Sequence, residues 1–342
     1  MNLFITNREI IKKGKNESIR EDGGEHAGDN LRFGSYDTAK EQFNLFPEPA
    51  DESETLYNDL LKKDKYALRG SVAFFREVYD ELMKPDNKSG GIIKNDVLFF
   101  IHGFNTNLNG VREAYEHLNT RYVENPKSPV RHIIIFTWPG KSPAVPLHYF
   151  DDKKDAIRSG EALARGIEKV IRFFKEFLVN ARNEPCHRKI HLMVHSMGHR
   201  VLKHMMLELK NNRIPIPDLF TEIVLMAADI EYDIFERDEA FNSLIDLGNR
   251  IHVYYNNNDR VLDISKYTKN FSNRLGRYGR KRIDTTLADV LDANVTSTKD
   301  DKKFGLEEKL LNHWYYYTSS EAADDIIEVL KGGKSEYIDK PS

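Results

Sequence analysis

Short apolar runs alternate with amphipathic segments along most of this chain of 342 residues. The runs at residues 97–101 and 132–137 are apolar throughout, which is typical of strands buried on both faces of a parallel sheet. Further strands are expected at 190–194, 222–227, 250–255 and 287–295. Strands that alternate with helices predict an α/β fold, in which helices cover both faces of a mostly parallel central sheet.

Helical spacing of apolar residues predicts the intervening helices at 71–83, 110–122, 155–181, 198–209, 237–247 and 319–330. Short strands are expected at 3–6 and 31–36, loops at 11–30 and 46–56, and a break in the chain at 85–91. No linker interrupts the pattern, so we expect a single domain over residues 1–342. In it, residues 1–90 add edge strands, loops and a helix.

The composition excludes several classes of partner and location. The formal net charge is −3, so no strong overall field attracts nucleic acid or a membrane surface. Cys186 is the only cysteine, which excludes an intrachain disulfide framework and suits a reducing compartment. The first residues do not read as a secretory signal, and no stretch reaches the roughly 20 apolar residues that span a bilayer. We therefore expect a cytoplasmic protein without stable membrane insertion, and the sequence does not indicate its oligomeric state.

A strand that turns sharply into a helix around a serine is predicted at residues 194–198, with the sequence VHSMG. This is the arrangement of a nucleophile elbow, whose usual signature is G-x-S-x-G. Val194 replaces the first glycine, whereas Gly198 lets the strand and helix backbones approach closely. Ser196 is thus the candidate nucleophile, although a serine in such a turn is more often only a turn or cap residue.

A serine nucleophile needs a base to remove its proton and an acid to orient that base. In α/β-hydrolases these residues follow the serine in the order acid, then histidine. His313 is the only histidine beyond residue 252 and is the candidate base. Asp259 follows the second strand after the elbow and is the favoured acid, Asp229 follows the first and is the alternative, and Asp263 ranks last.

Two backbone N–H groups are needed to stabilise the oxyanion that forms during acyl transfer. We expect one from Met197, at the start of the helix, and the other from Phe104, in the loop 101–106 after an earlier strand. Aromatic residues near the ends of strands are candidates for an apolar substrate pocket. Trp138, Tyr149 and Tyr315 are the predicted substrate contacts.

Seven short motifs resemble the α/β-hydrolase superfamily, and most of all a bacterial esterase/lipase-like branch of unknown function. They are residues 4–8 (FITNR), 101–106 (IHGFNT), 137–140 (TWPG), 194–198 (VHSMG), 227–230 (AADI), 258–262 (NDRVL) and 312–315 (NHWY). The resemblance implies the α/β-hydrolase fold, with Ser196 as nucleophile, Asp259 as acid and His313 as base. It implies no particular substrate, because this fold hosts many reactions.

The expected activity is hydrolysis of a small carboxylic ester through an acyl-enzyme, without a cofactor or metal ion. The alternative is a non-catalytic module of the same fold that binds a ligand or partner. Four histidines recur at positions 187, 191, 195 and 199, but the strand pattern there disfavours a shared metal site. The basic run 274–282 is normally a solvated loop, with attraction of anionic substrates as the weaker hypothesis.

Overall fold

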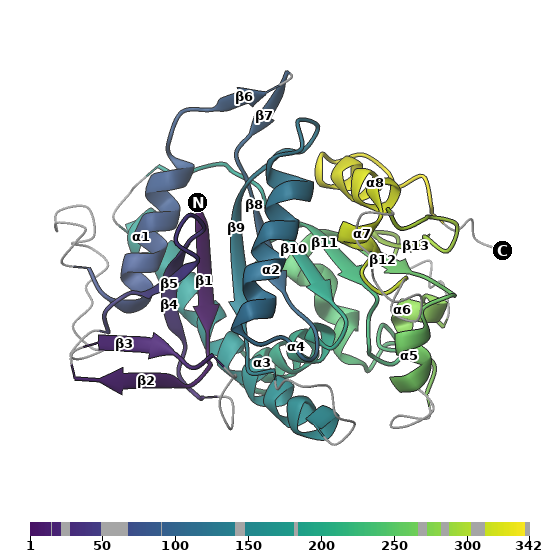
Figure 1. Ribbon diagram of the computed structural model, residues 1–342, viewed down its shortest axis with the longest axis horizontal. Coiled ribbons are helices and arrows are strands. Elements are labelled where there is room, and N and C mark those ends of the chain that lie inside the picture. The colour runs from purple at the N-terminus through teal and green to yellow at the C-terminus, as the bar shows by residue number, and fades with distance from the viewer. Residues whose placement is uncertain are drawn as a thin grey trace.

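The computed structural model describes residues 1–14, 16–21, 28–48, 68–89, 91–140, 148–180, 184–265, 272–281, 287–301 and 312–338. A nine-stranded sheet crosses the molecule in the order β13-β12-β11-β10-β8-β9-β1-β4-β5 (Figure 1). Its strands are β1 (Asn2–Thr6), β4 (Arg32–Asp37), β5 (Gln42–Leu45), β8 (Asp96–Ile101), β9 (Val130–Thr137), β10 (Ile190–His195), β11 (Phe220–Met226), β12 (Gly248–Tyr255) and β13 (Val290–Asn294). Only β4 pairs antiparallel with both of its neighbours, so the predicted mostly parallel sheet is confirmed.

Helices cover both faces of this sheet, as predicted. The α-helices are α1 (Gly70–Leu82), α2 (Leu108–Leu118), α3 (His148–Phe173), α4 (Gly198–Asn211), α5 (Arg260–Ser265), α6 (Leu275–Tyr278), α7 (Tyr315–Thr318) and α8 (Ser320–Leu330). Two π-helical turns, η4 (Asn119–Val123) and η5 (Phe174–Asn180), extend α2 and α3, and η6 (Ala240–Leu247) is a 3-10 helix. No helix in these described ranges is long and apolar enough to cross a membrane.

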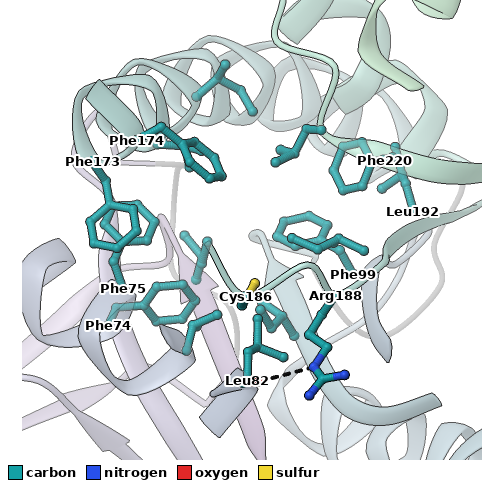
Figure 2. Close-up of a pocket in the computed structure, with 18 of the residues that line it drawn as sticks. Phe74, Phe75, Leu82, Phe99, Phe173, Phe174, Cys186, Arg188, Leu192 and Phe220 are labelled. Atoms are coloured by element: carbon teal, nitrogen blue, oxygen red, sulfur yellow. Dashed lines mark hydrogen bonds between the residues drawn. The ribbon is translucent and has the colours of Figure 1, made fainter. Parts of the chain in front are cut away.

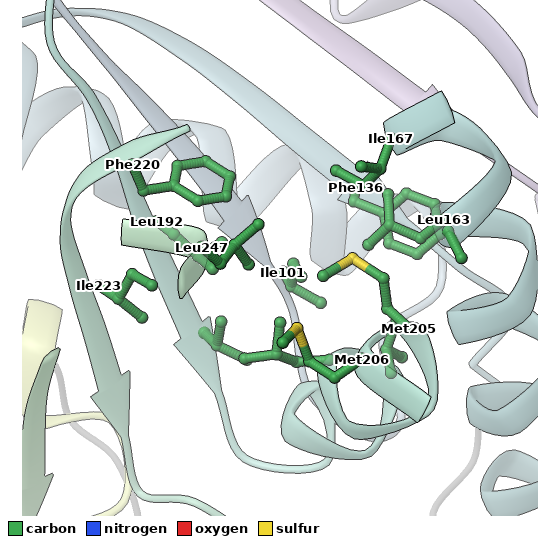
Figure 3. Close-up of a cluster of buried hydrophobic side chains, with 14 of the residues drawn as sticks. Ile101, Phe136, Leu163, Ile167, Leu192, Met205, Met206, Phe220, Ile223 and Leu247 are labelled. Atoms are coloured by element: carbon green, nitrogen blue, oxygen red, sulfur yellow. The ribbon is translucent and has the colours of Figure 1, made fainter. Parts of the chain in front are cut away.

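Two layers of apolar side chains hold the helices to the sheet. One layer joins α1, α3, α4 and η6 to alternate residues of the strands. Figure 3 shows part of it, where Met205 and Met206 of α4 lie near Ile101 of β8. The other layer joins α2, η4, α7 and α8 to the opposite face. Each fully buried Leu or Met contributes about 1.5–3 kcal/mol, so the strands are strongly fixed between these layers.

Several expectations for the N-terminal part were wrong. Within the expected loop 11–30, β2 (Ile10–Lys13) and β3 (Asn16–Ile19) form an antiparallel hairpin, in which Ile10 pairs with Ile19. The expected break at 85–91 contains most of a second hairpin, β6 (Asn87–Ser89) with β7 (Ile92–Lys94). Both hairpins are too polar to show the apolar runs by which the other strands were found. Most of the expected loop 46–56 lies outside the described residues.

The carboxyl ends of β8, β10, β11 and β12 meet along one edge of the sheet, because these neighbouring strands are parallel. The turn after β10 therefore lies beside the loop after β8, and the loops after β11 and β12 lie next to it. In Figure 1 the N-terminal strands are at one end of the sheet, whereas α5 to α8 gather at the other end, around β12 and β13. Segments far apart in sequence thus come together at this edge.

Candidate active site

Ser196 occupies a strained turn between β10 and α4. Its backbone φ is +51°, in the left-handed region that costs a residue with a Cβ about 1–2 kcal/mol. Hydrogen bonds from both sides hold the turn: the Ser196 N–H donates to Met226 O at 3.1 Å, and its carbonyl accepts from the Asp229 N–H at 3.2 Å. His199 Nδ1 also donates to that carbonyl, at 2.8 Å. The predicted elbow is therefore present in geometry.

His313 joins this turn to the loop after β12. Its Nε2 lies 3.0 Å from Ser196 Oγ, and its Nδ1 lies 2.7 Å from Asp259 Oδ2. A carboxylate can only accept, so Nδ1 carries the proton, and Nε2 is free to accept the proton of the Ser196 hydroxyl. The three side chains are almost fully buried, with Ser196 the most exposed at 6%. They form one continuous hydrogen-bonded chain.

The loop after β12 fixes the carboxylate of Asp259. Asp259 Oδ1 accepts from the Leu262 N–H at 3.1 Å, at the start of α5, and leaves Oδ2 for His313. Arg277 Nη1 also donates to the Asp259 carbonyl at 2.7 Å. The carboxylate thus has one oxygen bound to its own loop and the other bound to the imidazole.

The alternative acid, Asp229, has a different partner. Its carboxylate lies 3.4 Å from the guanidinium of Arg274, which has no exposed surface. Its backbone N–H supports the Ser196 turn instead. Asp263, the third carboxylate, pairs with Arg277 at 3.0 Å. Of the three carboxylates considered, the structure brings only that of Asp259 into contact with the imidazole.

His195 contacts the backbone of His313, a role that the sequence analysis missed. Its Nε2 donates to the His313 carbonyl at 3.0 Å, and the two rings are 4.8 Å apart. Burial lowers the pKa of His195 well below its ordinary value, so this ring is neutral. A neutral His195 adds no positive charge beside the imidazole of His313. Its position directly before Ser196 could have indicated a role near the serine, but the sequence analysis considered His195 only as a metal ligand.

The two expected oxyanion donors lie on adjacent segments of this edge. Met197 is the N-cap residue of α4, and the first N–H groups of a helix have no acceptor inside it. Phe104 belongs to the loop after β8, whose Gly103 is packed directly against the Ser196 turn. A Cβ on Gly103 would lie 2.9 Å from Ser196 Cβ. The loop carrying Phe104 therefore lies immediately beside Ser196.

Two of the three predicted substrate contacts, Trp138 and Tyr315, are buried in the structure. Trp138 has no exposed surface, stacks on His102 and donates from Nε1 to the His102 carbonyl at 3.0 Å. Tyr315 is 1% exposed, and its hydroxyl accepts from the Ala227 N–H and donates to the Tyr254 carbonyl. Both rings are thus buried and hydrogen-bonded to backbone groups, so neither has the exposed surface expected of a substrate contact. The side chain of Tyr149 lies outside the described residues.

The basic run 274–282 does not form a free cationic surface within its described part. Arg274 is buried beside Asp229, Arg277 pairs with Asp263, and Arg280 pairs with Asp292 at 2.9 Å. Carboxylates therefore neutralise these arginines inside the fold. These ion pairs do not favour the hypothesis that the run attracts anionic substrates.

The four regularly spaced histidines have separate partners. His191 lies 3.2 Å from Asp96, while His195 and His199 contact the carbonyls of His313 and Ser196. His187 has a φ of +51° and precedes β10, at the opposite end of that strand from Ser196. In the described part of the chain, no group of three or more potential ligands is placed to hold a metal ion.

A cavity of about 420 Å³ lies away from this edge, between the sheet and the helices α1 and α3. Figure 2 shows Phe74 and Phe75 of α1 with Phe173 at the end of α3, on the side of the cavity away from Phe220. Ser196, Asp259 and His313 are absent from its lining. The hydrogen-bonded chain therefore lies outside this cavity.

Comparison with known proteins identifies the family of this chain. Among solved structures, the proposed cell surface hydrolase of Lactobacillus plantarum WCFS1 is 9% identical, with a TM-score of 0.33 over 69% of this chain and 90% of that one. An uncharacterized protein from Bacillus cereus ATCC 10987 is 15% identical, with a TM-score of 0.28 over 57% of each chain. Scores this low do not establish a shared fold, and no curated protein matches. Residues 90–330, however, match the model of the family described as alpha/beta hydrolase of unknown function (DUF900), and the chain belongs to this family.

Proposed function

We propose that this chain is a serine hydrolase that cleaves a small carboxylic ester through an acyl-enzyme. The observation that carries the proposal is the hydrogen-bonded chain from Ser196 through His313 to Asp259, built from three distant segments. A serine, an imidazole and a buried carboxylate in this order are the groups that nucleophilic acyl transfer requires. Membership of a hydrolase family agrees with it.

In the proposed first step, Ser196 Oγ attacks the ester carbonyl carbon while His313 Nε2 takes the hydroxyl proton. The negative charge that develops on the carbonyl oxygen is stabilised by the N–H groups of Met197 and Phe104. Asp259 stabilises the imidazolium and keeps its Nδ1 proton in place. Collapse of the tetrahedral intermediate breaks the ester bond, and the imidazolium donates its proton to the leaving alcohol.

In the proposed second step, His313 removes a proton from water, which attacks the acyl carbon. A second tetrahedral intermediate forms at the same oxyanion site. Its collapse returns the proton from the imidazolium to Ser196 Oγ and releases the carboxylic acid. The hydrogen bond from His195 to the His313 carbonyl supports this cycle, because it holds the backbone of the base close to Ser196. In both proposed steps, the imidazole of His313 thus carries every proton that is transferred.

Labelling with a fluorophosphonate probe tests the proposal. The wild-type protein should become covalently labelled at Ser196, whereas folded Ser196→Ala and His313→Ala should not. Ser159→Ala is the matched control, since Ser159 is also buried but binds Asn7 at 3.0 Å. With p-nitrophenyl esters, Ser196→Ala should lower kcat on the order of a million-fold. A folded wild-type protein that is neither labelled nor active on esters and thioesters would favour the binding module instead.

A further inference from the structure

Arg8, two residues after β1, is a buried arginine whose hydrogen bonds are all with neutral groups. It is 2% exposed, its Nε donates to Thr137 Oγ1 at 2.7 Å, and its Nη2 donates to the Thr106 carbonyl at 2.5 Å. Its Nη1 has no hydrogen-bond partner among the described residues. Burial lowers the pKa of Arg8 to about 9, while the charges of Asp152 and Glu21 act in the opposite direction. The hydrogen bonds of Arg8 join the chain after β1 to Thr137 at the end of β9 and to Thr106 in the loop after β8.

The same guanidinium contacts His102 in the loop after β8 and contributes to its protonation state. Arg8 Nη2 lies 3.4 Å from His102 Nε2, and the Trp138 N–H donates to that nitrogen at 3.2 Å. His102 Nε2 therefore accepts, and the proton resides on Nδ1, which donates to the Gly103 carbonyl at 2.9 Å. Burial, helped by the charge of Arg8, lowers the pKa of His102 to about 3 and keeps the ring neutral.

Arg8 thus holds the loop at both ends of the short segment 103–106. Through His102 it fixes the Gly103 carbonyl, and directly it fixes the Thr106 carbonyl. Between these two points lie Phe104 and Asn105, the latter with a φ of +55°. A non-glycine residue in this conformation is strained and persists only where the surroundings impose it.

We propose that Arg8 is a positioning residue that holds the loop 102–106 in the conformation that presents the Phe104 N–H beside Ser196. The inference rests on the proposed function and extends it to a residue before the part of the chain that matches the family model, residues 90–330. Oxyanion donors act only when they are fixed in advance, and an error of about 1 Å in position costs about 100-fold in rate. Arg8 supplies this rigidity without contacting the substrate.

The test compares Arg8→Gln and Arg8→Ala with Arg32→Gln as the matched control. Arg32 is also a buried arginine, 6% exposed, and lies on β4 opposite Thr6 of β1. Its guanidinium pairs with Glu17 and Glu48, away from the loop 102–106. Both replacements remove a buried guanidinium next to β1, so a general loss of stability should affect them alike.

For the folded fraction of each protein, we expect kcat on an ester to fall about 100- to 1,000-fold in Arg8→Gln, with KM little changed. A trifluoromethyl ketone, which mimics the oxyanion, should bind more weakly by the same factor. Millimolar guanidinium chloride should restore part of the activity of Arg8→Ala. The proposal is wrong if Arg8→Gln keeps kcat within threefold of wild type, or if Arg32→Gln loses as much.

Hydrogen exchange separates this proposal from the proposed function. The amides of residues 103–106 should exchange faster in Arg8→Gln than in wild type, and at the wild-type rate in Arg32→Gln. This readout needs no activity, so it still decides on the contacts of Arg8 if the wild-type protein hydrolyses no ester. Unchanged exchange of these amides in Arg8→Gln would overturn the positioning role, whereas missing hydrolysis alone would overturn only the proposed reaction.

Discussion

Asp229 and Asp259 both follow parallel strands after Ser196, and their surroundings separate them. Asp259 divides its carboxylate between its own loop and His313, whereas Asp229 faces the buried guanidinium of Arg274. A carboxylate that binds the Nδ1 proton selects the imidazole tautomer that can accept from serine. A carboxylate beside a buried arginine neutralises a charge that has no exposed surface. We therefore expect the Asp259–His313 contact to affect the rate of the proposed reaction, and the Asp229–Arg274 contact to affect the stability of the fold.

Replacing each acid by asparagine should separate these two effects. In Asp259→Asn, the amide no longer imposes the required tautomer, so kcat should fall about 10⁴-fold while the protein stays folded. In Asp229→Asn, kcat per folded molecule should stay within a few fold of wild type, but the free energy of unfolding should fall by about 1–3 kcal/mol. Ester hydrolysis and urea unfolding measure both quantities. Equal losses of kcat in the two variants would contradict the assignment of the acid.

For individual residues of the candidate site, the sequence allowed the residue types and their order to be predicted. It did not allow the neighbours of each side chain in the folded chain to be predicted. The serine, the late histidine and both candidate acids follow from position along the chain. Position along the chain also favoured Asp259 over Asp229, but the buried Arg274 that faces Asp229 comes close only in the folded chain. The burial of Trp138 was not predictable, because a ring near the end of a strand looks the same in sequence whether it lines a pocket or supports a loop.

The turn into α4 depends on how closely that helix approaches β8. A Cβ on Gly198 would lie 2.6 Å from the His102 carbonyl and 2.9 Å from the Ile101 carbonyl, and backbone atoms cannot easily move away. On Gly110, in the first turn of α2, a Cβ would lie 3.1 Å from Thr106 Cγ2 and 3.8 Å from Asn107 Oδ1, which are side-chain rather than backbone atoms. The two glycines have similar positions in their helices and different surroundings.

Gly198→Ala should therefore destabilise the protein by about 1–3 kcal/mol through overpacking against the backbone of β8. Gly110→Ala should leave stability unchanged or raise it by up to about 1 kcal/mol, since alanine favours the helix. Denaturant unfolding of both variants measures the difference, and the rate of fluorophosphonate labelling should fall only in Gly198→Ala. If Gly198→Ala is as stable as Gly110→Ala, close contact between α4 and β8 does not govern this turn.

Elements were predictable where burial produces a regular pattern. The central strands are buried on both faces and the long helices on one, so their apolar residues recur at fixed spacing. The short helices α5, α6 and α7 have four to six residues, too few for any spacing to appear. Strand β5 was missed because only every second residue packs inward, with Phe43 against Tyr36 at 4.7 Å between the rings.

The N-terminal strand belongs to the interior of the whole sheet. β1 pairs with β9 on one side and with β4 on the other, so it closes an edge that β9 would otherwise expose. Residues 3–8 are therefore buried in the core and, through Arg8, contact the loop beside Ser196. This arrangement agrees with the expectation of one domain over residues 1–342, which stays a prediction. Sequence order alone could not place a strand from the start of the chain next to β9.

Buried neutral histidines are distributed through the molecule, and they couple its stability to pH. Burial lowers the pKa of His102 and His132 to about 3, and that of His199 and His204 to about 4. An unfolded histidine has a pKa near 6.5, so between about pH 6.5 and 4 the unfolded chain binds more protons than the folded one. The stability from these groups is fully present above pH 6.5 and decreases as the pH falls.

His132→Leu should make this dependence less steep. His132 is 1% exposed on β9, neither ring nitrogen has a hydrogen-bond partner among the described residues, and it lies away from Ser196, on a different strand. Leucine removes one titrating group without breaking a hydrogen bond. Between pH 6 and 4, the free energy of unfolding should therefore fall less steeply in His132→Leu than in wild type. The two slopes should differ by about 1.4 kcal/mol per pH unit, the contribution of one proton. Urea unfolding across this range measures both slopes, and parallel curves would show that His132 is not neutral in the folded protein.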